Sequence, residues 1–478
     1  MTRPRTRLRP AGGKTVLVLA TARRFVLAVA AALLLPALPA MAQSPLLVAP
    51  PTLLVPNDDS LPIGTWPAFE ANAAVVRTDD SSAVWFNPAG LARAGTSSAA
   101  ASASTIVRTR IESDGFASDV EGSQLSPSQF AAVLTALREK TGLTLGFGIT
   151  RLVSWDVRAD GLVFHDVPGG RRRVTFSESG SYVRTSYGAA VARDLSPLVR
   201  AGLGLSVESV DTVAFVAGTD AVVGTTTRTF TFRQDGENQT LLLRATLGLQ
   251  ADLGGGWGLG AVLRSPGVTL SSTGRFGGDY TFDEPAQTTN VTFFDDEAGG
   301  ESRLPFEAVL GAAVKAGRLS LEGQVRYFGP GGAHDAFSTD HPATVIWTGA
   351  KPEPVVYTVA VPPTRTSRRA IVDLALGGHV DLGTSRKVRL HAGVGTSSAP
   401  VPSGDPLFTR ADLWSATLGA TTRVSSLQLS VGFRYERGSI DDVRSEVLPM
   451  GEVVRSGATI RNLGVVFSFA YDAAGGAK

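Results

Sequence analysis

The histidines of this 478-residue chain are the first candidates for chemistry, because imidazole can bind metals and titrates near neutral pH. There are five of them. His379 and His391 fall on the polar faces of two neighbouring alternating segments, so they could form a proton-sensitive pair. The simpler interpretation, which we favour, is that they are ordinary polar residues of those faces.

Two further groups of side chains carry the ligand types of a surface cation site. They are His334, Asp335, Asp340 and His341, and Asp295, Asp296 and Glu297. Three consecutive arginines, Arg171, Arg172 and Arg173, could contact lipopolysaccharide phosphates. All three groups lie in polar stretches, so a solvated loop is the alternative in each case. We predict no metal site.

Catalytic motifs are absent from the sequence, which has no Gly-x-Ser-x-Gly, no His-Glu-x-x-His and no phosphate loop. We therefore expect no enzyme, no catalytic residue and no cofactor. Eight charged residues fall on the polar faces of alternating segments: Arg200, Glu208, Arg244, Asp252, Arg264, Glu307, Glu322 and Arg326. Charges that share an interior favour a structural network, although some could hold a ligand carboxylate.

Residues 1–42 look like a secretory signal peptide, with basic residues, an apolar run and a small-x-small end. The whole chain has 45 basic and 43 acidic residues, and removing the seven basic residues of this leader from the 45 leaves 38 against 43. That balance argues against a nucleic-acid partner. The absence of cysteine from an exported chain excludes a disulfide framework and a thiolate metal site.

Apolar and polar residues alternate along most of the remaining chain. In 241–253 every odd position is apolar, and 427–436 repeats the pattern. We predict about fourteen strands, at 96–111, 128–137, 142–157, 181–193, 199–214, 238–253, 257–273, 304–315, 318–329, 368–382, 386–397, 411–424, 427–440 and 457–471.

The connections distinguish a barrel from a sandwich. Short turns follow the even-numbered segments, and long polar connections follow the odd ones, at 112–127, 158–180, 215–237, 274–303, 330–367, 398–410 and 441–456. This alternation is typical of outer-membrane barrels, and a sandwich has no reason to show it. We predict an all-β fold, a transmembrane antiparallel β-barrel of about 14 strands that occupies residues 96–478.

One segment conflicts with this prediction. Residues 126–137 begin like a helix capping box and continue with an apolar stripe at helical spacing. We nevertheless predict a strand over 128–137, because leaving it out would break the strand parity and leave an unpaired edge in lipid.

Residues 79–95 are too polar at their start and too rich in Pro and Gly at their end for a regular helix or strand. Their apolar knot, 84–86, must be covered, and Asn87 before Pro88 predicts a turn. We predict a compact hatch in the barrel lumen. With the preceding Pro-rich tail it occupies 43–95, and the tail is either a plain linker or a segment that reaches into the lumen.

The string from Asp79 to Ala92, with its Asn-Pro-Ala, resembles the hatch signature of the outer-membrane transporters of long-chain fatty acids and toluene, the FadL type. Weaker similarities lie at 256–266, 304–305, 389–394 and 398–402. The resemblance implies a monomeric fourteen-stranded barrel that takes up hydrophobic small molecules and releases them sideways through a wall opening near a kinked strand. Its implied partners are a hydrophobic ligand, outer-membrane lipid and lipopolysaccharide, in the cell outer membrane. The implied hatch and gating residues are Asp79, Asp80, Asn87, Pro88, Ala89 and Gly90.

Two rival functions stay open. A barrel lipase would need a nucleophile beside a histidine at the bilayer rim. An open porin, or a structural or adhesive barrel, would have no need of a hatch packed in its lumen.

Overall fold

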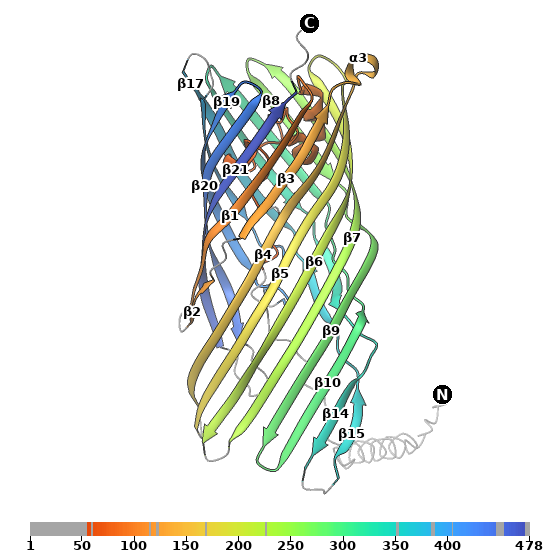
Figure 1. Cartoon of the computed structure of the whole chain (residues 1–478), viewed down its shortest axis with the longest axis vertical. Helices are drawn as coiled ribbons and strands as arrows, with labels where there is room; N and C mark the ends of the chain where they lie inside the picture. The colour runs from red at the N-terminus through yellow and green to blue at the C-terminus, as the bar shows by residue number, and fades with distance from the viewer. Residues whose placement is uncertain are drawn as a thin grey trace, which may run out of the picture. The chain divides into compact units, whose positions relative to one another are not determined.

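The computed structural model describes most of the chain after residue 54 (Figure 1). The described ranges are 55–58, 61–113, 116–120, 124–167, 170–224, 227–349, 353–383, 388–403, 405–445 and 454–473. They belong to one compact unit, Val48–Lys478. The predicted signal peptide, 1–42, and the first part of the predicted tail lie outside the described residues.

Fourteen antiparallel wall strands close into a barrel, as predicted. They are β1 (Ser98–Ser113), β3 (Gln124–Leu134), β4 (Leu143–Val167), β5 (Gly170–Asp194), β6 (Val199–Gly224), β7 (Arg228–Gly254), β8 (Trp257–Arg264) continued by β9 (Val268–Glu284), β11 (Glu307–Ala316), β12 (Leu319–Phe328), β17 (Ile371–Leu382), β18 (Val388–Ser397), β19 (Ala411–Val424), β20 (Leu427–Ser445) and β21 (Val454–Asp472). β1 pairs with β21 on one side and β3 on the other, which closes the ring.

Shorter strands lie in the long connections. They are β2 (Phe116–Val120), β10 (Gln287–Ala298), β13 (Gly331–Phe337), β14 (Ala343–Thr348), β15 (Val355–Val359) and β16 (Thr364–Arg368). β9, β10, β14 and β15 lengthen the wall at the end opposite the short turns (Figure 1). Among the described residues, no helix is both long enough and apolar enough to cross a bilayer.

The two faces of the wall have the polarity that lipid requires. On β20, Leu429, Val431 and Phe433 point outward and are 45%, 47% and 58% exposed, whereas Ser430 and Arg434 are buried. An apolar outer face around a polar interior is the arrangement of a membrane barrel. A sandwich would bury the apolar face, so that alternative is wrong.

The predicted loops at 158–180 and 215–237 are wrong. β4 pairs with β5, and β6 with β7, almost to their tips, so both stretches are mostly strand. In the same way, 274–303 contains the β9–β10 hairpin. These stretches are less apolar on their outward face than the strands before them, so the alternation fades although backbone pairing continues.

The segment 126–137 is mostly strand, as predicted against its local pattern. β3 runs to Leu134, and a single helical turn, α3 (Arg138–Thr141), follows it. Phe130 and Leu134 are both exposed on the outer face. Residues four apart share a face in a helix and in a strand, so this spacing could not distinguish the two.

Candidate functional site

The hatch, which we define as residues 55–58 and 61–95, lies inside the barrel near the short turns (Figure 1). It contains three short helices, η2 (Pro67–Phe69), α2 (Ala83–Phe86) and η3 (Pro88–Arg93). Most of its residues are buried. Its backbone bonds to lumen-facing side chains of the wall, as where Val76 N donates to Glu322 at 2.8 Å. The hatch therefore fills the lumen at this level.

Local sequence explains the turns of the hatch. Asp80 accepts hydrogen bonds from the Thr65 hydroxyl at 2.7 Å and from Ser82 N at 2.8 Å, just before α2. Asn87 is extended, as a following proline requires, and its side chain accepts from Ala89 N at 3.1 Å to cap η3. The predicted turn at Asn87 is present, between two short helices.

Asn87 also ties the hatch to itself and to the wall. Its Nδ2 donates to the Val75 carbonyl at 2.7 Å and to the Leu249 carbonyl of β7 at 2.9 Å. Asn87 is fully buried. If its side chain were removed, each of these two carbonyls would lose a hydrogen-bond donor that water could not readily replace.

Paired glycines let the hatch backbone lie directly on the wall. Gly202 of β6 and Gly248 of β7 face each other across the strands. A Cβ at Gly202 would overlap the Pro88 carbonyl, and one at Gly248 would overlap the Asn87 side chain. Only glycine permits so close an approach.

The same arrangement recurs around the lumen. Three more cross-strand glycine pairs carry hatch residues: Gly260 and Gly311 under Val75, Gly377 and Gly393 under Glu70, and Gly419 and Gly432 under Phe69. Sequence reasoning missed these residues. The signal available was glycine recurring on the polar face of one strand after another.

The other predicted hatch residues divide into packed and exposed positions. Gly90 lies against the Thr78 carbonyl, where a Cβ would not fit. Ala89 is fully buried, whereas Asp79 is exposed. The structure therefore brings residues 87–90 together against the wall and gives Asp79 no comparable place there.

The predicted interior charges form ion pairs, and all eight take part. Glu307 is their centre, paired with Arg264 and lying 3.5 Å from both Arg244 and Arg326. Arg264 also donates to the Trp85 carbonyl, and its guanidinium lies 4.1 Å from the centre of the Trp85 ring. The network thus holds the hatch, which is the structural role that the sequence favoured.

Three charged residues that sequence reasoning missed extend this network. Arg184 bonds to Asp58 at 2.9 Å and to Glu208 at 2.8 Å, and Asp58 also pairs with Arg368. Asp58 belongs to the Pro-rich tail, where no strand pattern could place it. The described part of the tail therefore reaches into the lumen.

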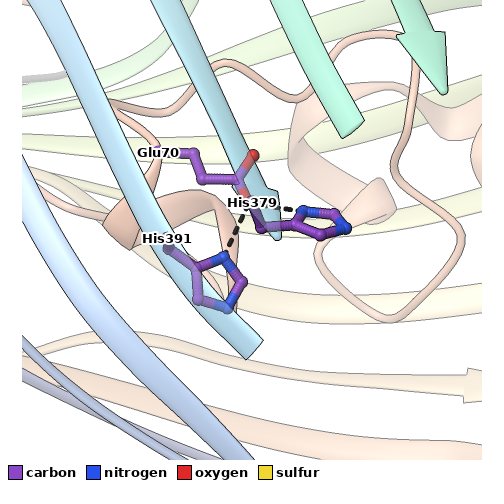
Figure 2. Close-up of side chains that lie close together, drawn as sticks. All are labelled: Glu70, His379 and His391. Carbon is purple, nitrogen blue, oxygen red and sulfur yellow. Dashed lines mark hydrogen bonds and ion pairs between the residues drawn. The ribbon is translucent and has the colours of Figure 1, made fainter. Parts of the chain in front are cut away.

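A second cluster joins the hatch to β17 and β18. Glu70 Oε1 lies 2.8 Å from His379 Nδ1 and 2.6 Å from His391 Nδ1, as Figure 2 shows, and the other carboxylate oxygen pairs with Arg77. Burial by itself would raise the pKa of Glu70, but the bonds from both histidines and the charge of Arg77 lower it to about 2. Glu70 is therefore ionised at neutral pH.

The loop groups do not gather into sites. His334 is buried and bonds to the Gly332 carbonyl, while Asp335 pairs with Arg365 at 2.8 Å. His341 lies 3.6 Å from Asp295, without a third ligand nearby among the described residues. In the arginine run, Arg172 is buried against Asp220 at 2.6 Å, so it cannot meet lipopolysaccharide. Arg171 and Arg173 are exposed.

The wall is interrupted between β3 and β4. These strands pair only over residues 129–134 and 145–150. Among the described residues, 124–127 pair with β1 alone, and β4 beyond residue 150 pairs with β5 alone. The β-ladder therefore opens into a gap.

A β-bulge lies on each side of this gap. Ser128 is the extra residue in the β1–β3 pairing, and Leu152 is the extra residue in the β4–β5 pairing. Bulges bend strands, and Pro127 has no amide hydrogen with which to extend a ladder. The Arg151 side chain donates to the Ser126 hydroxyl across the gap at 3.3 Å.

The hatch covers the inner side of the gap. Leu61 N donates to the Leu152 carbonyl at 3.2 Å. The apolar knot of the hatch, Trp85 and Phe86, belongs to one hydrophobic cluster with Leu152 and Trp155 of β4. The predicted knot is therefore covered by the strand that borders the gap.

A cavity of about 930 Å³ borders the same gap. Its lining includes Pro127 and Ser128 of β3 and Arg151 of β4. Ser128 is fully buried, whereas Phe130 and Ile149, also in the lining, point outward. The cavity therefore touches residues of both faces of the wall.

No protein-family model and no curated protein sequence matches this chain. Solved structures match its fold. The Pseudomonas putida toluene transporter TodX is 12% identical with a TM-score of 0.58, over 86% of this chain and 98% of that chain. A Pseudomonas aeruginosa FadL homologue is 14% identical with a TM-score of 0.55, over 88% of this chain and 99% of that chain. The chain thus has the FadL-type barrel fold, and the predicted resemblance to these transporters is confirmed at the level of the fold.

Proposed function

We propose that this protein takes up hydrophobic small molecules across the outer membrane and releases them sideways between β3 and β4. The observation that carries the proposal is the gap in the β-ladder, bordered by two bulges and a cavity and covered from inside by the hatch. A hydrophobic solute gains by passing from a lined cavity into acyl chains without entering water.

The hatch supports sideways rather than axial release. It fills the lumen, and several glycine pairs and ion pairs hold it to the wall. Moving the whole hatch would break buried ion pairs, and leaving one partner of such a pair unmatched costs about 3–5 kcal/mol. Moving only the residues that cover the gap would cost much less free energy.

We assign two roles within the hatch. Asn87, Pro88, Ala89 and Gly90 seat it on the wall, with Asp80 capping the turn before them. Residues 61–63, which include the Leu61 contact with β4, act as the gate, whereas Asp58 stays in its ion pairs with Arg184 and Arg368. Asp79, predicted from the resemblance, is exposed and has no role in this assignment.

The ligand class rests on the apolar lining. Among the described residues, the lining of the cavity beside the gap includes Phe130, Ile149 and Tyr187 and contains no acidic residue. TodX is a toluene transporter by name, and the second neighbour is a FadL homologue. Aromatic hydrocarbons and long-chain fatty acids are therefore the proposed substrates.

The rival functions fit these contacts less well. Thr421 Oγ1, His391 and Glu70 do form a hydroxyl–imidazole–carboxylate chain, at 2.9 and 2.6 Å. However, His391 is 1% exposed where the hatch meets the wall, and both of its ring nitrogens are occupied by Glu70 and Thr421, so the imidazole is not placed to pass a proton to a bound ester. The filled lumen likewise disfavours an open porin.

The test is uptake by cells or vesicles that carry the full chain. Labelled toluene and labelled oleate should enter faster than in vesicles without the protein, and mass spectrometry of protein purified in mild detergent should find hydrophobic molecules bound. Uptake of sugars without uptake of either hydrophobic probe would contradict the proposal.

A further inference from the structure

Glu70, His379 and His391 bring three metal-ligand atoms together where the hatch meets the wall. A carboxylate oxygen and two imidazole nitrogens lie within 4.8 Å of one another, and both rings are directed at the carboxylate (Figure 2). Among the residues that the structure describes, no other group of three such ligands is so arranged. We propose that these three residues bind a divalent transition-metal ion, such as Zn²⁺, which fastens the hatch to β17 and β18.

The backbone holds the ligands in place without the ion. His379 and His391 are direct partners across the β17–β18 ladder, so both rings start from fixed positions. Gly377 and Gly393, two residues from them, support the backbone of Glu70. Two nitrogens and one oxygen form a common ligand set for zinc, and a fourth position stays open for water.

The local charge favours a cation. The carboxyl groups of Glu70 and Glu322 share one guanidinium, that of Arg77, which bonds to both. With neutral imidazoles the group therefore holds two acidic side chains against one basic side chain, away from bulk water. Arg77 Nη1 lies 3.3 Å from His379 Nδ1, which reduces the attraction for a cation without reversing its sign.

The surroundings of His391 suit either state of the site. Its Nε2 lies 2.9 Å from Thr421 Oγ1, and that oxygen lies 2.8 Å from Ser430 Oγ. Without an ion, Nδ1–H donates to Glu70 and the Thr421 hydroxyl donates to Nε2. With an ion on Nδ1, the ring proton sits on Nε2 and donates to Thr421, whose hydroxyl turns to Ser430. No proton is gained or lost, and this outer contact orients the ligand ring.

Room for the ion requires a small movement. Zinc binds imidazole nitrogen at about 2.0–2.1 Å, so ligand atoms around one tetrahedral ion lie about 3.3 Å apart. The carboxylate oxygen, at 2.8 Å from His379 Nδ1 and 2.6 Å from His391 Nδ1, must therefore withdraw by about 0.5 and 0.7 Å, and the two nitrogens must take up the same spacing of about 3.3 Å. The side chain of His379 keeps 11% exposure and gives the ion a path of entry.

The experiment uses the full mature chain without a histidine tag, in mild detergent, with Co²⁺ as the probe. Four-coordinate Co²⁺ absorbs strongly in the visible range, so binding is seen directly. We expect one equivalent of Co²⁺ to produce this band and Zn²⁺ to remove it by displacement. His379→Ala and Glu70→Gln should each weaken binding at least about tenfold, and Thr421→Val about tenfold.

Matched variants separate binding from folding. His341→Ala removes an exposed histidine near Asp295 and should leave the band unchanged. Because Glu70→Gln changes a hatch residue, His379→Asn, which changes a wall residue and leaves Glu70 its contacts with His391 and Arg77, repeats the test. Heat-modifiable migration in gels checks the fold of each variant. A wild-type protein without the band, or a band that survives in the His379→Ala/His391→Ala double variant, would overturn the proposal. The readout is metal binding, so it does not depend on the proposed transport function.

Discussion

The hatch meets the wall in two different ways. Against β6 and β7 the ladder is continuous, and Pro88 rests directly on a glycine pair. Beside the gap between β3 and β4 the ladder is open, and the hatch contacts there include a backbone hydrogen bond from Leu61 and apolar packing around Leu152. The β6–β7 side of the wall fixes the hatch by close packing, and the β3–β4 side leaves a passage that a short segment of the hatch covers. Sideways release follows from this difference.

The largest effect should come from filling the gap. Ser128, the extra residue of the bulge in β3, is fully buried beside the gap, and Ser128→Trp would place a large ring in the passage. We expect uptake of labelled toluene to fall at least about tenfold, because the tryptophan ring would occupy the gap through which the solute must pass. Ser128→Ala is the control. It loses one hydrogen bond to Ser102 but keeps the space open, so uptake should persist. If Ser128→Trp transports normally in a folded barrel, the gap is not the exit.

The next effect should come from the side of the wall formed by β6 and β7. Gly202→Ala places a methyl group against the Pro88 backbone, and we expect the free energy of unfolding to fall by about 3 kcal/mol. Gly204→Ala lies two residues away on β6, where the nearest atom to a Cβ would be 3.5 Å away, so its change should stay within about 0.5 kcal/mol. Urea unfolding in detergent measures both. Equal changes in the free energy of unfolding of the two variants would show that the paired glycines have no special role.

The smallest effect should come from Asn87→Ala. This variant removes two side-chain hydrogen bonds to carbonyls and the cap of η3, and it should lower the free energy of unfolding by about 2 kcal/mol. We expect weaker uptake from a barrel that still migrates as a folded, heat-modifiable species. Unchanged uptake of labelled fatty acid and toluene would show that the seat at Asn87 has no part in transport.

The sequence predicted the barrel because lipid requires every wall strand to alternate apolar residues that face outward with polar residues that face the lumen. Alternation, strand parity and turn lengths together placed all fourteen strands, including β3 against its helical spacing. Alternation could not identify the parts of the strands that extend beyond the bilayer, where lipid no longer imposes this requirement. Beyond the bilayer, β4 to β7 continue as paired backbone with a weaker alternation, so those stretches were predicted as loops.

The site was predictable only in part. The hatch string and the interior charges follow from local sequence, since Asn87-Pro88 dictates a turn and charges on a polar face must find partners. The gap between β3 and β4 depends on which residues fail to pair, and the glycine pairs depend on register between strands. Neither property belongs to any single segment, so neither could be read from one strand at a time.

The most direct test locks the hatch to the wall and measures transport. A Cβ built on Gly395 would lie 3.5 Å from the Ala71 Cβ, which is within reach of a disulfide, and the chain has no other cysteine. The Ala71→Cys/Gly395→Cys variant should take up labelled toluene equally well when oxidised and reduced, because release between β3 and β4 needs no movement at β18. Uptake that stops on oxidation and returns on reduction would contradict sideways release past a seated hatch.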